Sequence, residues 1–206
     1  WRHRGWQSPT SAANLFPGAP PVLGRQAPVS IRGPPVVDRR LSGEWTIMTQ
    51  RADAHIHLFS GGYQDSSFAS RPGVAIDEAA CYHSLAVDCD VTAALVVGFG
   101  GEDWCVENNA YLAEQVGRYE WIRPLAYLRL DALLTVDGLQ RLQQQGFVGV
   151  SLFLFDDEAV RLPAVPDTFW RWLEQRNWLV SVNSQAAGWC YWAPILERFP
   201  GLRLLV

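Results

Sequence analysis

Short apolar runs alternate with longer amphipathic segments along the chain from Arg51 onward. The runs are rich in β-branched or aliphatic residues, and the segments between them repeat apolar residues at helical spacing. This alternation predicts an α/β domain built on a parallel sheet. The expected strands are Ala52–His57, Val91–Phe99, Ile122–Leu128, Phe147–Leu154, Leu179–Asn183 and Leu202–Val206.

Helix-start and helix-stop residues fall in the segments between the expected strands. Asp77 can cap a helix that runs to about Asp88, and a second helix is expected over about residues 104–119. Asp167 follows Pro166 and begins a further helix. The remaining two helices are marked by Asp137 with Gly146, and by Trp192, Ile195, Leu196 and Phe199.

The spacing of the expected strands indicates the kind of sheet. Successive strands begin about 23 to 39 residues apart, which suits the βα units of a (β/α)8 TIM barrel. A doubly wound open sheet is the alternative, but no G-x-G-x-x-G motif follows the first strand. A full barrel needs about 250 residues, and 159 remain from Met48 onward (206 − 47). We therefore expect an incomplete TIM barrel with about six strands present, in a chain truncated after the sixth.

Residues 1–47 have a composition of their own. Seven of the 13 prolines lie here, six Arg face only Asp38 and Glu44, and neither a helical nor a strand period is sustained. We expect a disordered Pro/Arg-rich extension. Because the only Met of the chain is Met48, we interpret it as non-native upstream sequence read in frame, with a flexible tail or a transit peptide as the alternatives. The N-terminal part of the barrel is then expected over residues 48–206.

Charge and hydropathy argue against two classes of partner. The net charge of −4 at pH 7 is unevenly distributed, because residues 1–47 are basic and residues 48–206 carry eleven Arg against nineteen acidic residues, a net charge of −8. A domain this acidic is not expected to bind the phosphate backbone of a nucleic acid. No run approaches the roughly 18 apolar residues of a membrane helix, and the start does not resemble a secretory signal. We expect a cytoplasmic protein without a membrane partner. Its four cysteines form no C-x-x-C pair and are expected to be buried free thiols.

The first expected strand contains the motif Asp53-Ala54-His55-Ile56-His57. Alternate residues of a strand face one side, so Asp53, His55 and His57 are expected to point into the barrel together. Two imidazoles in this position can share one divalent metal ion, and neutral imidazole suits Zn²⁺. The carboxylate of Asp53 could orient one ring or act as a weak ligand.

Two segments resemble the amidohydrolase superfamily, in particular its amidohydrolase-related branch of lactonases and decarboxylases. They are Ala52–Phe59, with the two histidines, and Leu196–Val206. The resemblance implies a metal-dependent hydrolase in which a metal-activated water attacks a lactone, ester or amide carbonyl of a small carboxylated substrate. It also implies metal ligands at His55 and His57, a histidine ending the fifth strand and an aspartate ending the eighth, with an assisting histidine after the sixth.

The sequence departs from this pattern in ways that limit the site. Asn183 occupies or adjoins the position of the fifth-strand histidine, and an amide oxygen is a poor zinc ligand. The residues that the family uses after the sixth and eighth strands would lie beyond Val206, so no catalytic residue is assigned and this fragment is expected to be inactive. The chain has no Lys, so the modified-lysine bridge of the family's binuclear members is excluded.

Several functions stay open on the sequence alone. Arg129 follows the third strand and could anchor a substrate carboxylate, with a surface salt bridge as the alternative. A decarboxylase on the same scaffold, a non-catalytic relative, and a metal-independent hydrolase that uses Arg129 are the alternatives to the metal-dependent hydrolase. A small-molecule substrate is the expected partner, and homo-oligomerisation is left open.

Overall fold

A computed structural model describes residues 36–37, 47–48, 50–64, 74–132, 134–155 and 158–206. Its central element is a six-stranded parallel sheet in which the strands stand in chain order. Each strand lies within two residues of its expected bounds. The strands are β3 (Arg51–Ile56), β4 (Val91–Val97), β5 (Ile122–Tyr127), β6 (Gly149–Leu154), β7 (Leu179–Ser184) and β8 (Arg203–Leu205).

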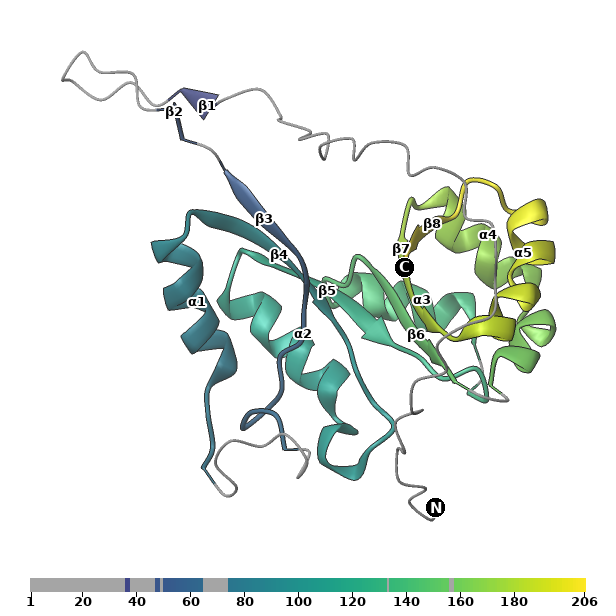
Figure 1. The fold of residues 1–206 in the computed structure, drawn as a ribbon, viewed down its shortest axis with the longest axis horizontal. Coiled ribbons are helices and arrows are strands. Elements are labelled where there is room, and N and C mark those ends of the chain that lie inside the picture. The colour runs from purple at the N-terminus through teal and green to yellow at the C-terminus, as the bar shows by residue number, and fades with distance from the viewer. Residues whose placement is uncertain (1–35, 38–46, 49, 65–73, 133, 156–157) are drawn as a thin grey trace, which may run out of the picture. The chain divides into compact units, whose positions relative to one another are not determined.

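The strand order distinguishes the two sheet architectures that the sequence left open. A doubly wound sheet reverses its strand order at a switch point, whereas the order β3-β4-β5-β6-β7-β8 advances by one strand at every step. Figure 1 shows a strongly twisted sheet, with α1 and α2 along its first strands and α4 and α5 beside its last ones. The chain therefore forms six strands of an incomplete TIM barrel, as expected.

The helices follow the expected segments, with two differences at their beginnings. The second helix begins four residues later than expected, at Asn108, because Asp103–Cys105 forms a separate 3₁₀ turn. The third is capped by Thr135, whose hydroxyl accepts a hydrogen bond from the Gly138 N–H at 3.1 Å, and not by Asp137. The helices are α1 (Glu78–Asp88), α2 (Asn108–Arg118), α3 (Val136–Gln144), α4 (Asp167–Gln175) and α5 (Ala193–Arg198).

The hydrophobic core lies between the helices and one face of the sheet. Alternate strand residues such as Val150 and Leu152 of β6 and Val180 and Val182 of β7 pack there against apolar helix residues. The intervening residues form the opposite face, which is the interior face of the barrel. Five of them are buried: Val97, Leu125, Gly149, Ser151 and Ser181. Because side chains alternate between the two faces of a strand, the face toward the helices forms the hydrophobic core, and the interior face can carry the residues of a site.

Three expectations from composition have different outcomes. Two short strands, β1 (Val36–Val37) and β2 (Ile47–Met48), pair antiparallel, while the rest of 1–47 lies outside the described residues, so its disorder stays a prediction. No described helix is both long enough and apolar enough to cross a membrane. The four cysteines are free, but only Cys105 is buried, so the expectation of four buried thiols is wrong.

Glycine permits a close approach of two strands just after β4. A Cβ atom on Gly98 would lie 2.4 Å from the carbonyl oxygen of Leu125 and 2.7 Å from the backbone nitrogen of Tyr127. A Cβ on Gly100 would lie 2.3 Å from the Tyr127 ring. The Gly98-Phe99-Gly100 stretch is therefore needed to bring the end of β4 against β5.

We predict that Gly98→Ala lowers the free energy of unfolding by about 2 kcal/mol or more, because backbone atoms cannot move aside for the new methyl group. Gly117→Ala is the matched control, since a Cβ there meets nothing within 4 Å. In the helix α2 this change should raise the free energy of unfolding by about 0.5–1 kcal/mol. Urea denaturation of both variants measures the difference, and equal destabilisation would contradict the prediction.

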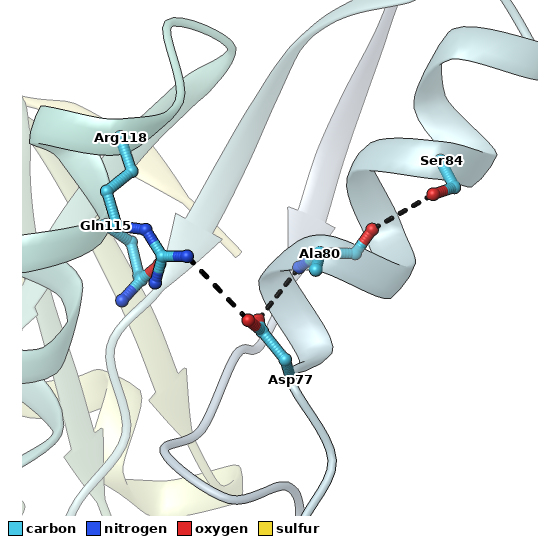
Figure 2. Close-up of polar contacts among 5 residues, drawn as sticks. All are labelled: Asp77, Ala80, Ser84, Gln115 and Arg118. Carbon is cyan, nitrogen blue, oxygen red and sulfur yellow. Dashed lines mark hydrogen bonds and ion pairs between the residues drawn. The ribbon is translucent and has the colours of Figure 1, made fainter.

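Polar contacts around Asp77 hold the beginning of α1 (Figure 2). As expected, Asp77 caps this helix, since its carboxylate accepts a hydrogen bond from the Ala80 N–H at 2.9 Å. Arg118 of α2 lies 3.9 Å from the same carboxylate, and both side chains are about half exposed. Exposed ion pairs contribute little, so the cap is the stabilising contact.

We predict that Asp77→Ala lowers the free energy of unfolding by about 1 kcal/mol, the usual contribution of an N-cap. Asp77→Asn should remain within a few tenths of a kcal/mol of the wild type, because asparagine caps equally well and only the ion pair is lost. Ser84→Ala, which removes an exposed hydroxyl bonded to the Ala80 carbonyl, is the control. A large loss in the Asp77→Asn variant would assign the stabilisation to the ion pair instead.

Candidate metal site on the first barrel strand

The two histidines of the motif converge on one point. His55 lies near the end of β3 and His57 directly follows this strand. Their Nε2 atoms are 3.3 Å apart, and the two rings meet edge to face with centroids 5.0 Å apart. Two nitrogen atoms of separate side chains are thus directed at the same small volume.

The backbone of β4 determines the orientation of the His57 ring. Its Nδ1 lies 2.7 Å from the carbonyl oxygen of Val97. A carbonyl only accepts hydrogen bonds, so Nδ1 carries the proton and Nε2 keeps its lone pair. In the metal-free protein, the contact between the two Nε2 atoms then requires the proton on Nε2 of His55.

Aromatic side chains surround His57 and favour its neutral form. The ring centroids of Phe59, Phe99 and Phe153 lie 6.1, 5.9 and 6.5 Å from that of His57. Burial lowers the pKa of His57 below its usual value, and the neighbouring His55 acts in the same direction, while the hydrogen bond to Val97 opposes them. A neutral imidazole with a free Nε2 is the form that binds a metal ion.

The separation of the two Nε2 atoms fits a divalent ion. Zinc binds histidine nitrogen at about 2.0–2.1 Å in tetrahedral geometry, which separates two such ligands by about 3.3–3.4 Å. The observed 3.3 Å agrees with this value. In the part of the chain that the structure describes, no third His, Cys, Asp or Glu joins the two histidines in a metal-binding group. The described residues thus bring together two candidate ligands, His55 and His57.

Asp53 does not share the face of the histidines, contrary to the alternation expected from the sequence. The ladder pairs Asp53 with Ala94 and Ile56 with Val96, so three steps on β3 match two on β4. This irregularity is a β-bulge. One extra residue in the strand places the side chains before the bulge on the opposite face of the sheet from the one that strict alternation predicts. The carboxylate of Asp53 accepts hydrogen bonds from the Tyr82 hydroxyl on α1 at 2.9 Å and from the His55 N–H at 3.1 Å. It therefore positions the backbone of His55 and not an imidazole ring.

Asn183 and Arg129 have different surroundings. Asn183 pairs in register with Phe153, which contacts His57, so Asn183 is on the interior face, and it is exposed. Its role as the fifth-strand substitute ligand stays a prediction. The guanidinium of Arg129 donates to both carboxylate oxygens of Asp131, at 2.9 and 2.6 Å. This pairing raises the pKa of Arg129 and lowers that of Asp131. The structure thus agrees with the salt-bridge alternative for Arg129.

Three polar residues that sequence reasoning did not select hold the strand ends around the site. The carboxylate of Glu78 accepts hydrogen bonds from the N–H groups of Phe59 and Tyr63, at 2.7 and 2.8 Å. The side chains of Asn108 and Asn109, at the start of α2, bond to backbone groups that follow β3 and β4 and to the end of β5. Asparagine is unfavourable inside helices because its side chain bonds to nearby backbone groups. Two asparagines in succession at a helix start could therefore have indicated from the sequence that these side chains bond to backbone groups.

Comparisons with known proteins identify the fold. No family model and no curated protein matches the sequence. A probable 2-pyrone-4,6-dicarboxylic acid hydrolase from Acinetobacter baumannii, solved with citric acid, is 20% identical with a TM-score of 0.53 over 74% of this chain and 56% of that chain. An amidohydrolase from Burkholderia multivorans, solved with zinc, is 16% identical with a TM-score of 0.56 over 75% and 56%. The chain thus spans a little over half the length of these proteins.

We predict that protonation of His57 opposes folding of the metal-free protein. Because burial lowers the pKa of His57, the unfolded chain takes up a proton at a higher pH than the folded chain does. Stability is then fully present above the unfolded pKa of about 6.5 and is lost as the pH falls from there toward the folded pKa. Urea denaturation with a chelator between about pH 8 and pH 5 should show a steeper loss for the wild type than for His57→Gln. Parallel curves would contradict this prediction.

Proposed function

Because the chain has the barrel fold of the amidohydrolase-related proteins, we propose that it is part of a metal-dependent hydrolase that uses His55 and His57 as metal ligands. The observation that carries the proposal is the 3.3 Å separation of their Nε2 atoms, together with the hydrogen bond to Val97 that leaves Nε2 of His57 unprotonated. The zinc in the Burkholderia multivorans amidohydrolase supports the choice of ion.

Each residue of the site has a separate task in this proposal. His55 and His57 hold the ion, which when bound would polarise a carbonyl group and lower the pKa of a water molecule. The carbonyl of Val97 holds the proton on Nδ1 of His57 and so keeps the ring in its ligating tautomer. Phe59 and Phe99 exclude water from one side of that ring.

The proposed substrate is a small carboxylated molecule with a lactone, ester or amide carbonyl. The Acinetobacter baumannii structure holds citric acid, and its protein is named as a hydrolase of a dicarboxylic acid. The Nε and one Nη of Arg129 already bind Asp131, so paired hydrogen bonds from this edge of the guanidinium to a substrate carboxylate require Asp131 to release it. We therefore assign the hydrolytic chemistry to the histidine site and no anchoring role to Arg129.

A non-catalytic relative is the second candidate, and the ligand set is the observation that favours it. Asn183 stands at the end of β7, where a histidine would complete the pattern that the sequence resembles. In the described residues, no acidic, cysteine or histidine side chain replaces it near the pair. A protein of this kind would keep the barrel and bind zinc weakly.

We predict that the full-length protein binds one zinc ion and that His55→Ala and His57→Ala each abolish this stoichiometric binding, because either change removes one member of the ligand set. His83→Ala is the matched control, since His83 lies on α1 and accepts a hydrogen bond from the Trp121 indole. Competition with a chromophoric zinc indicator measures the affinity, and elemental analysis after desalting measures the stoichiometry.

The three variants separate the two candidates. Loss in the His55 and His57 variants with retention in the His83 variant supports the metal-dependent hydrolase. Zinc retained by both site variants would refute the ligand assignment. A wild-type protein that binds no zinc would favour the non-catalytic relative.

A further inference from the structure

We propose that Asn108 is a positioning residue that holds the His57 imidazole in its ligating orientation. The inference rests on the proposed function, because its consequence is for the metal affinity of the site. The hydrogen bonds of the Asn108 side chain go to backbone groups and not to an imidazole ring. It acts through the backbone that follows His57 and through the backbone that follows Val97.

The first part of the argument is the peptide unit just after His57. The Asn108 Nδ2 donates a hydrogen bond to the carbonyl of Leu58 at 2.8 Å. The N–H of Phe59, at the other end of the same peptide unit, donates to Glu78 at 2.7 Å. An amide from α2 and a carboxylate from α1 therefore hold both polar groups of one peptide, one residue beyond the ligand. This fixes the direction in which the chain leaves His57.

The second part of the argument is the connection to β4. The Asn108 Oδ1 accepts a hydrogen bond from the N–H of Phe99 at 3.1 Å. Phe99 is two residues after Val97, whose carbonyl bonds to the His57 Nδ1. The ladder between β3 and β4 has its last pair at Ile56 and Val96. Asn108 therefore links the ends of β3 and β4 by side-chain hydrogen bonds, just beyond the last backbone pair of the two strands.

Burial makes the Asn108 amide hard to replace. The side chain is 5% exposed, so water cannot readily substitute for a lost hydrogen bond. Asparagine supplies a donor for Leu58 and an acceptor for Phe99 from one short side chain. An ionised aspartate at this position would keep the acceptor but place a negative oxygen against the Leu58 carbonyl.

Asn109 provides a matched control one residue along the helix. Its Nδ2 donates to the carbonyl of Tyr127 and its Oδ1 accepts from the N–H of the same residue, both at 2.8 Å. The chemistry equals that of Asn108, but the bonded strand is β5. Asn109→Asp therefore imposes the same change of charge and donor without acting on the backbone next to His57.

The test compares Asn108→Asp with Asn109→Asp in the full chain. The first readout is the ¹⁵N NMR shift pattern of the His57 ring in metal-free protein at about pH 8, above the ordinary histidine pKa of about 6.5. We expect wild type and Asn109→Asp to show the proton on Nδ1, and Asn108→Asp to show a mixture of tautomers. The second readout is zinc affinity, which should fall by about ten-fold or more in Asn108→Asp alone. Circular dichroism establishes that each variant is folded.

The two readouts distinguish a failure of this inference from a failure of the proposed function. If the wild type binds no zinc, the tautomer readout still decides the positioning role, because the bond to Val97 belongs to the metal-free protein. Wild-type ring shifts in a folded Asn108→Asp variant would overturn the inference. Equal effects of the two substitutions would also overturn it, since they would indicate a general loss of packing. If Asn108→Asp does not fold, Asn108→Ser removes the same donor without adding charge and takes its place.

Discussion

The backbone groups at the carboxyl ends of parallel strands have to find partners once the sheet ladder stops, and much of this structure depends on how they do so. Buried N–H and C=O groups are costly to leave unpaired. Here α1 and α2 supply the partners through Glu78, Asn108 and Asn109. Because these helices also pack on the other face of the sheet, the core and the strand ends are held by the same elements.

The same arrangement makes the interior face suitable for a site. Apolar strand residues that face the helices form the core, so the interior side chains can be polar. His57 gains its fixed tautomer from the Val97 carbonyl and its lowered pKa from burial. Gly98 allows β4 and β5 to lie close together because it has no side chain. Any side chain there would collide with the backbone of Leu125 and push β5 away from β4. The candidate site thus depends on close strand spacing as much as on its histidines.

The alternation of apolar runs and amphipathic segments predicted all six strands of the sheet, because the periods of 2 and 3.6 residues follow from local backbone geometry. The spacing of the strands along the chain predicted the barrel class. The paired histidines of the first strand were evident for the same reason. Helix beginnings were less predictable. Thr135 rather than Asp137 caps α3, and both residue types are favoured at N-caps, so the residue type alone does not decide between them.

Tertiary structure alone decided the orientation of Asp53 and the partners of Asn108. A bulge in β3 turns Asp53 toward Tyr82, and only the pairing with β4 reveals that bulge. The Asn108 amide bonds to a carbonyl 50 residues away. Local sequence determines which residues can form a strand or a helix, since that depends on neighbours along the chain. Which polar groups meet depends on register and on long-range contacts, and these exist only after the strands and helices have packed.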